Sequence, residues 1–391
     1  MDQSNHEAQK VSVQKRRLVL SAILLGTCVL FLARPVSAED FSGQIVIVTT
    51  PKYERALRNE ISQYQRVLYR EGFQVDILSE DWISAEQIKH ALTSSRYESI
   101  DGAIMLGNVP AALVKRGKEE PRPCALFMMD LNGQWTKAKD GGDYYSGVPE
   151  WPEINPEIWV GYITAETLDG DPVEYARVYL ERTVRYHESG TVDGQNGALT
   201  FIDDEWAKRG ASTLGLEEIY HDKVTVVNNS DSTTAARYRE ELAKTYEFIH
   251  LIAHNNHGFT GHRFAEKSGV ANVDYKVVQY IQPKALFYNL GICSNACFTQ
   301  PNYAGGWYLF GGEGLVVLGT TMPGAMNKSD YLYARLAEGV SFGEALKEWF
   351  HEEIPRDLDS TNRRWYLSVV LLGDPTIRRP RVTSVQQADF A

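Results

Sequence analysis

Short, continuously apolar runs alternate with amphipathic segments along most of this chain, and this alternation restricts the folds open to it. In the first half we predict strands at 44–50, 73–78 and 102–106, with helices between them over 54–71 and 84–95. Runs without polar alternation suit strands that are buried on both faces. The strand–helix–strand order implies a parallel sheet covered by helices.

The same alternation begins again after the polar, glycine-rich stretch 189–196. The further strands are predicted at 157–163, 198–202, 224–227, 248–253, 285–290, 314–318 and 366–372. We therefore expect an α/β protein of two side-by-side α/β/α units with mostly parallel sheets. The N-terminal subdomain covers 39–190, the second subdomain covers 197–380, and 381–391 forms a tail. Residues 116–154 lack periodicity and are predicted to be an irregular surface region.

The first 38 residues are predicted to be a secretory signal peptide. Four basic residues between Lys10 and Arg17 precede the uncharged run 18–33, and Ala38 ends a stretch of small residues suited to cleavage. The uncharged run is shorter than the roughly 20 residues that a spanning helix needs. The sequence thus predicts an exported protein, periplasmic or extracellular, with no membrane contact after cleavage. An uncleaved segment would instead leave it membrane-anchored.

The charge balance narrows the classes of partner. The chain has 51 Asp and Glu against 40 Lys and Arg, a net charge of −11. Nucleic-acid binding needs a cationic surface, so we expect no nucleic-acid partner. The sequence carries no signal for an oligomeric state.

Cys293 is the predicted nucleophile. Three cysteines follow the signal segment, Cys124, Cys293 and Cys297, and an odd number leaves at least one free thiol. Cys293 comes directly after the apolar run that begins at Ala285, so it belongs at the carboxyl edge of a parallel sheet, where ligands bind. A thiolate there can act as a nucleophile once a neighbouring imidazole removes its proton. The alternative is a small residue buried in the core.

Two histidines are candidates for the general base. His254 ends the strand 248–253, and His257 follows three residues later with Gly258 after it. A base must approach the nucleophile's proton to about 3 Å, which favours residues at a strand end. The Gly258 N–H could help to hold an oxyanion. His250 is expected in the core and His262 in a loop.

Metal or cofactor chemistry is the less favoured interpretation. The spacing of His250, His254, His257 and His262 suggests a metal cluster, but the helical HExxH pattern is absent and the surrounding run indicates a strand. We predict no metal ligands and no cofactor, and retain a metal-dependent hydrolase using this histidine cluster as an alternative.

The chain resembles the gingipain family of cysteine peptidases, which have a caspase-like fold. The resemblance covers about 45–378 and lies in short segments along the chain: Met105–Val109, Pro156–Gly161, Cys293–Phe298, Gly311–Gly319, Ser341–Ala345 and Leu372–Pro375. The sequence departs from the family at Ala296, where the family has Gly, and at His254, which Asn follows. Strand position favours His254 as the base, and the His-Gly dipeptide favours His257.

This resemblance implies a thiol peptidase that acts on peptides or proteins. The second subdomain would be the catalytic one, with Cys293 attacking the scissile carbonyl to form a thioester. Backbone N–H groups near Cys293, including that of Ser294, would hold the oxyanion together with Gly258. A catalytically inactive binding or scaffold protein of the same fold is the alternative.

Overall fold

The computed structural model describes residues 41–97, 99–148, 153–190, 197–207, 214–256, 258–267, 269–324, 329–356 and 363–379. The chain separates into the units Met1–Phe41 and Ser42–Ala391, and the fold below is that of the second unit. The predicted signal peptide, the stretch 191–196 and the tail 381–391 lie outside the described residues. No described helix is long and apolar enough to cross a membrane.

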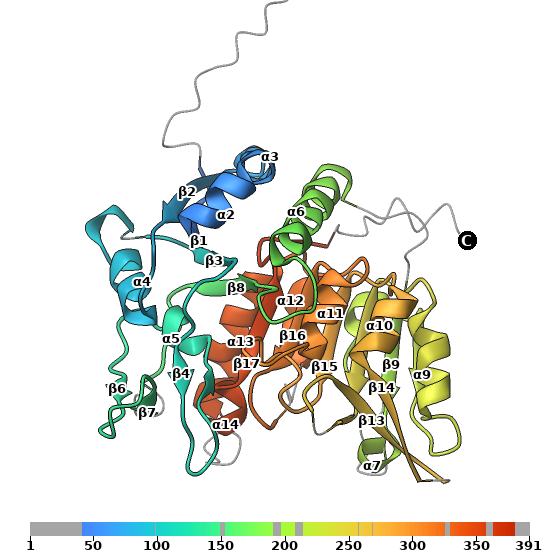
Figure 1. The fold of residues 1–391 in the computed structure, drawn as a ribbon. Helices are drawn as coiled ribbons and strands as arrows, with labels where there is room; N and C mark the ends of the chain where they lie inside the picture. The colour runs from blue at the N-terminus through green and yellow to red at the C-terminus, as the bar shows by residue number, and fades with distance from the viewer. Residues whose placement is uncertain are drawn as a thin grey trace, which may run out of the picture. The chain divides into compact units, whose positions relative to one another are not determined.

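A ten-stranded sheet forms the centre of the fold (Figure 1). In order across the sheet, the strands are β10 (Val224–Val227), β9 (Ala198–Ile202), β11 (Phe248–Ile252), β15 (Phe287–Gly291), β16 (Val316–Thr320), β17 (Val369–Gly373), β8 (Trp159–Ile163), β3 (Gly102–Leu106), β1 (Gly43–Thr49) and β2 (Phe73–Ser79). Within each half the strands pair in parallel, and β17 runs antiparallel to β16. The predicted mostly parallel α/β fold is confirmed.

The two predicted halves share this one sheet. The last strand, β17, lies between β16 of the second half and β8 of the first. It pairs with five residues of β16 but with only Gly161 and Tyr162 of β8. The halves are therefore joined by the C-terminal strand rather than by the chain segment between them.

Helices cover both faces of the sheet (Figure 1). The helices are α2 (Pro51–Ala56), α3 (Arg58–Arg70), α4 (Ala85–Leu92), α5 (Leu126–Met129), α6 (Pro172–Ser189), α7 (Asp204–Ala207), α8 (Glu217–Tyr220), α9 (Ala235–Leu242), α10 (Tyr275–Ile281), α11 (Ala304–Phe310), α12 (Asp330–Ala337), α13 (Phe342–Arg356) and α14 (Arg363–Tyr366). A row of neighbours runs α3, α6, α11, α10 and α9, while α12 packs on α8 and α13.

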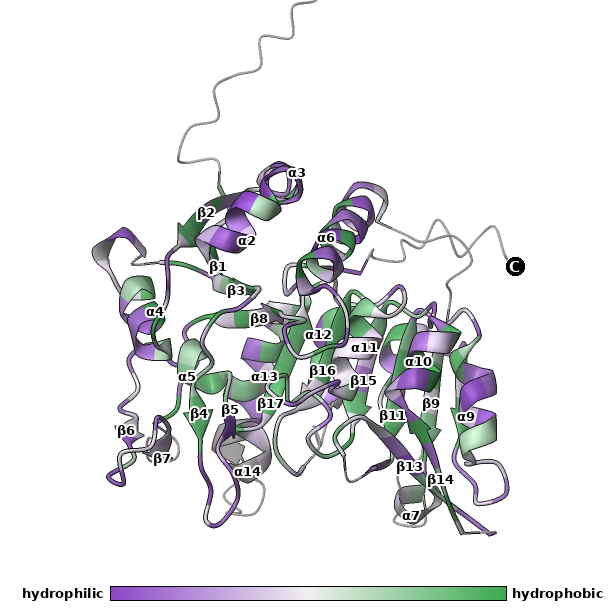
Figure 2. Cartoon of the chain, in the orientation of Figure 1, coloured by the Kyte–Doolittle hydropathy of each residue, from purple (hydrophilic) through white to green (hydrophobic). Residues whose placement is uncertain are grey.

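Local sequence explains where these elements begin and end. The side chain of Ser84 caps α4 by accepting from the Gln87 N–H, as its type and position predict. Gly72 follows α3 with φ +91°, a conformation that suits glycine. Figure 2 shows hydrophobic strands inside and polar outer faces on α3 and α9, which is the pattern that drives apolar burial.

Two small sheets were not predicted. The region 116–154, predicted to be irregular, contributes β5 (Arg122–Pro123), β6 (Thr136–Lys137) and β7 (Tyr145–Gly147) to a four-stranded sheet with β4 (Leu113–Val114). A second sheet contains β12 (His254–Asn255), β13 (Gly261–Glu266) and β14 (Gly269–Asp274). The strands of the first small sheet have two or three residues each and are too short for a periodic pattern to reveal them.

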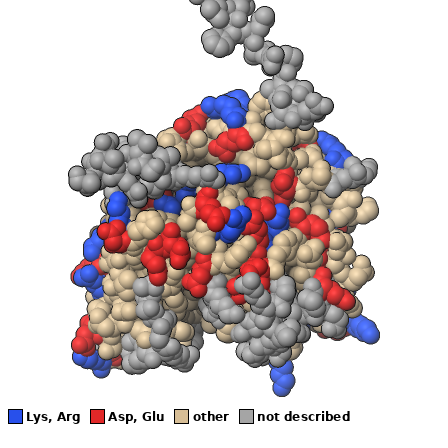
Figure 3. Space-filling view, turned by 180° about the vertical axis from the view of Figure 1, so that it is seen from behind, with Lys and Arg blue, Asp and Glu red and all other residues tan. Residues whose placement is uncertain are grey.

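The excess of acidic residues is visible on the surface. Figure 3, which shows the molecule from behind, has Asp and Glu side chains gathered across the middle of this face, with Lys and Arg among them. Many of the described acids are paired, as Glu348 is with Arg335 and Glu60 with Arg177. The net charge of −11 therefore describes the whole chain and not the potential at any one site.

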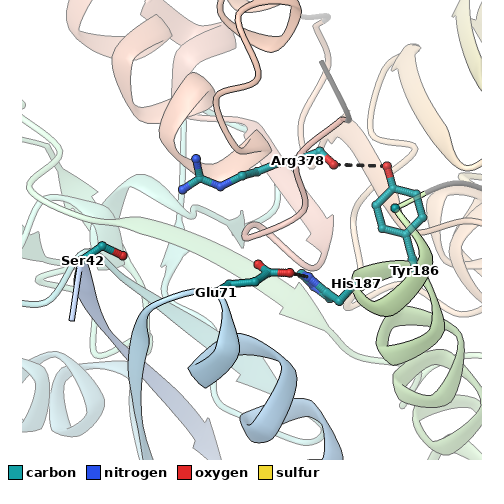
Figure 4. A pocket seen from close by; sticks show the side chains of 6 residues that line it. Ser42, Glu71, Tyr186, His187 and Arg378 are labelled. Carbon is teal, nitrogen blue, oxygen red and sulfur yellow. Dashed lines mark hydrogen bonds and ion pairs between the residues drawn. The ribbon is translucent and has the colours of Figure 1, made fainter. Parts of the chain in front are cut away.

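A buried histidine near the end of α6 contacts the residue that follows α3 and the residue that follows β17. His187 Nδ1 lies 2.6 Å from Glu71 Oε1, and its Nε2 lies 2.8 Å from Asp374 Oδ2. Figure 4 shows the carboxylate of Glu71 pointing at this ring, in a cavity of about 470 Å³ that Ser42, Tyr186 and Arg378 also line. Burial opposes a charge on the ring, but the hydrogen bonds and charges of Asp374 and Glu71 outweigh it and raise the pKa of His187 to about 9.

The free energy of unfolding is therefore expected to fall as the pH rises above neutral. The pKa of His187 rises from an ordinary 6.5 to about 9 on folding, so its contribution is full below pH 6.5 and is lost as the pH rises through about 9. The loss is about 3 kcal/mol. Urea midpoints measured from pH 6 to 10 should fall more steeply for the native chain than for a His187→Gln variant. Equal slopes for the two proteins would contradict the assignment.

Candidate active site

The register of two neighbouring strands brings His254 and Cys293 to the same edge of the sheet. Strands β11 and β15 pair in parallel, and the last paired residues are Ile252 and Gly291. His254 lies two residues beyond the first and Cys293 two residues beyond the second. Because adjacent strands are about 4.8 Å apart, the two reactive residues leave the sheet side by side.

A side-chain amide ties the two strand ends together. Asn255 Nδ2 donates to the backbone oxygen of Cys293 at 2.8 Å. Its Oδ1 accepts from the N–H of Phe259 at 3.4 Å. Asn255 thus connects the histidine-bearing strand, the loop after it and the turn that carries the thiol.

The turn that carries Cys293 is held in a constrained conformation. Ser294 has φ +56°, which is uncommon for a residue with a side chain. Its N–H donates to the Met322 oxygen at 3.1 Å and to Thr320 Oγ1 at 3.2 Å. The buried Asn295 accepts from the Thr320 N–H at 3.1 Å and donates to the Leu290 oxygen at 3.3 Å. The end of β16 therefore fixes the position of the thiol-bearing turn.

Of Cys124, Cys293 and Cys297, only Cys293 is partly exposed. All three thiols are free. Cys124 is buried, and burial raises its pKa to about 12, which suppresses the thiolate. Cys297 is buried as well, and its sulfur accepts a hydrogen bond from Arg122 Nη1 at 3.5 Å. Access therefore favours Cys293 as the reactive thiol.

His254 is the strand-end histidine that the structure describes. It lies in β12, paired with Arg263 of β13, and is half-buried. Its ring lies against the indole of Trp206, with 4.4 Å between the ring centroids. His257 lies outside the described residues.

The backbone N–H groups predicted to hold an oxyanion are already engaged. The Ser294 N–H has the two acceptors named above, and the Gly258 N–H donates to Asn256 Oδ1 at 3.1 Å. Ser294 is therefore poorly suited to the predicted role in this conformation. The N–H of Cys293 itself donates to no other group in the described part of the chain. Gly258 has room for a Cβ, whose nearest contact would be Thr260 Oγ1 at 3.5 Å.

His250 and His262 are core residues. The Tyr333 hydroxyl lies 2.7 Å from His250 Nδ1, and the Tyr308 hydroxyl lies 2.8 Å from His262 Nε2. Burial lowers the pKa of each to about 3. The core prediction for His250 is confirmed, whereas the loop prediction for His262 is wrong because it lies in β13 and is fully buried. The described residues hold no group of three or more His, Cys, Asp or Glu placed to bind a metal.

Loops from the first half also reach the site. Thr167, just after β8, donates through its hydroxyl to the Phe298 oxygen at 2.9 Å. Its own oxygen accepts from the Asn302 N–H at 2.8 Å, and the rings of Tyr162 and Phe298 stack at 4.8 Å. The surroundings of Cys293 therefore depend on both halves of the sheet.

Four residues that build this site were not predicted from the sequence: Asn255, Asn295, Thr320 and Arg122. One signal was available for three of them. Asn255, Asn295 and Thr320 are polar residues just beyond or at the ends of buried strands, where edge-facing groups belong. Arg122 gave no such signal, because its neighbourhood depends on contacts across the fold.

Comparisons with known proteins support the fold. No family model matches the chain, and no curated protein matches its sequence. The crystal structure of the Arg-specific cysteine proteinase gingipain R (RgpB) matches with a TM-score of 0.60 and 13% identity, over 88% of this chain and 80% of that one. The complex of the Porphyromonas gingivalis RgpB pro- and mature domains matches with a TM-score of 0.58 and 12% identity, over 86% of this chain and 80% of that one. The chain thus has a gingipain-like fold.

Proposed function

We propose that this chain is an exported cysteine endopeptidase, with Cys293 as nucleophile and His254 as general base. The observation that carries the proposal is the register of β11 and β15, which delivers a half-buried thiol and an imidazole to one sheet edge, two residues beyond paired positions. The similarity of the fold to that of gingipain R adds support at the level of architecture. The basic residues near the start of the sequence, followed by the uncharged apolar run 18–33, support export.

The proposed reaction proceeds through a thioester. His254 removes the proton of Cys293, and the thiolate attacks the scissile carbonyl carbon. The imidazolium then gives its proton to the leaving amine as the C–N bond breaks, which leaves an acyl group on sulfur. The same imidazole takes a proton from water, whose oxygen attacks the thioester and releases the thiolate and the carboxylic acid. The free Cys293 N–H is the proposed main oxyanion donor, since that of Ser294 is engaged.

A matched pair of variants decides between the two candidate bases. His254→Ala should reduce kcat/KM on a mixed peptide library by about 10²- to 10⁴-fold, the range for removing a general base. His257→Ala should change it by less than tenfold. Carboxamidomethylation of Cys293 should also be slower in His254→Ala, because the thiol loses the group that removes its proton. The opposite ranking of the two variants would assign the role to His257.

Turnover by the native chain is the wider test. A folded native protein that cleaves no peptide and reacts at Cys293 no faster than a model thiol would support a binding or scaffold role instead. Loss of activity on chelation, with no loss on alkylation, would favour a metal-dependent hydrolase.

A further inference from the structure

Arg122 lies beside the candidate site, and no carboxylate among the described residues pairs with it. Arg122 Nη1 donates to Cys297 Sγ at 3.5 Å, and its guanidinium lies over the ring of Phe259 with 4.8 Å to the centroid. Among the described residues, no Asp or Glu forms an ion pair with Arg122. A guanidinium has five N–H donors, and this one uses only one of them within the described fold.

The backbone around Arg122 is fixed to the strand end that holds the thiol-bearing turn. The hydroxyl of Thr321 donates to the oxygen of Pro123 at 2.5 Å. Its neighbour Thr320 accepts from the Ser294 N–H at 3.2 Å. A movement of β5 relative to Cys293 would therefore break contacts at the end of β16.

The side chain of Arg122 also contacts Phe259, which lies in the segment between β12 and β13. Phe259, on which the guanidinium lies, donates its N–H to Asn255 Oδ1, and Asn255 in turn holds the Cys293 oxygen. The Phe259 oxygen also accepts from the Ala304 N–H at 3.0 Å. A planar guanidinium stacked on an aromatic ring keeps its N–H groups directed outward and loses little entropy when it binds a carboxylate.

We propose that Arg122 forms a subsite for an acidic side chain of the substrate, next to the scissile bond. This proposal rests on the proposed peptidase function. A carboxylate in the subsite would accept the N–H donors that Arg122 does not use, in the bidentate geometry that guanidinium and carboxylate groups favour. The net negative charge of the chain does not oppose this, because charges farther than about 8 Å away are screened at physiological salt.

The first experiment compares matched peptides that differ only in Glu, Gln or Lys on either side of one cleavage position. The native chain should cleave the best Glu peptide about 10- to 100-fold faster, in kcat/KM, than its Gln counterpart. Arg122→Gln should bring this ratio close to one, and Arg122→Glu should favour Lys over Glu. Arg122→Lys should keep part of the preference for Glu, because lysine retains the positive charge but lacks the planar guanidinium that binds a carboxylate through two hydrogen bonds.

The control variant is Lys115→Gln. Lys115 directly follows β4 of the same small sheet, and its Nζ lies 5.1 Å from the Tyr144 ring centroid. Like Arg122→Gln, this variant removes one positive charge from the small sheet, but it does so next to β4 rather than in β5. The Glu preference should be unchanged in it, so a shared loss would indicate a change in the small sheet and would overturn the subsite.

The second experiment needs no turnover. Cys293 should react faster with iodoacetate, relative to iodoacetamide, in the native chain than in Arg122→Gln, by about fivefold, because a nearby cation attracts the anionic reagent. Mass spectrometry identifies the alkylated residue. If no peptide is cleaved, the peptidase function fails and this ratio still tests Arg122. Cleavage with no Glu preference, or an alkylation ratio equal in the two proteins, overturns the subsite and leaves the peptidase function standing.

Discussion

Replacement of Cys293 by alanine should reduce peptide hydrolysis by at least about a thousandfold, because the reaction loses its nucleophile. The thiol is half-buried, and the turn around it is held by backbone and Asn295 contacts that do not involve the sulfur. The variant should therefore unfold at nearly the same urea concentration as the native chain. Hydrolysis is measured as kcat/KM on the best peptide of a library, after circular dichroism has shown that the variant is folded.

Cys124→Ala is the matched control. Its thiol is buried and its pKa is raised to about 12, so it should have no part in the chemistry and its loss should leave hydrolysis within a fewfold of native. Iodoacetamide should label Cys293 first and stop hydrolysis in step with the labelling. Activity retained by Cys293→Ala would remove the thiol mechanism.

Replacement of Asp374 by asparagine should be the most destabilising single change of a charged group described above. Asp374 is fully buried, accepts from Thr376 N at 2.8 Å, and lies 2.8 Å from His187 Nε2. Breaking a buried pair costs about 3 to 5 kcal/mol because the remaining charge loses its partner. We expect about 3 kcal/mol, since the His187 ring can release its proton. Urea unfolding at pH 7 measures the change.

Glu71→Gln is the matched change on the other side of the same ring. The Glu71 side chain retains 32% of its exposure, so water can replace part of the lost interaction and the cost should be about 1 kcal/mol. Asp374→Asn should also flatten the fall in stability between pH 6.5 and 9, because the pKa of His187 returns toward its ordinary value. Equal costs for the two variants would show that burial does not set the strength of this pair.

The central strands were predictable from the sequence because each of them is a single run of mostly apolar residues. The predicted strands 102–106 and 198–202 match β3 and β9, whose residues are all buried. The predicted strand 224–227 matches β10, which is an edge strand with exposed residues, and the other predicted strands differ at their ends by a few residues. A strand covered on both faces needs an unbroken apolar run, and few other elements tolerate one. The hairpin of β13 and β14 was missed because its outer residues mix polar and apolar types, with only Val273, Phe264, His262 and Gly261 buried.

The candidate site was predictable only in part. The placement of Cys293 and His254 at strand ends followed from where apolar runs stop, and the structure brings the two strands together as neighbours. The hydrogen-bond partners of Asn255 and Thr320 could not be predicted, because a hydrogen bond between residues distant in sequence depends on strand order and register.

Patterns in the sequence were enough to predict that this chain forms a mostly parallel, helix-covered sheet and that a thiol and a histidine lie at the ends of two of its strands. Those features depend on periodicity and on residue type, which are local. Three other features could be seen only in the folded chain: β17 joins the two halves, His262 is buried, and Arg122 lies beside the thiol-bearing turn. These features depend on contacts between segments that are far apart in the sequence. A local pattern within one segment therefore cannot reveal them.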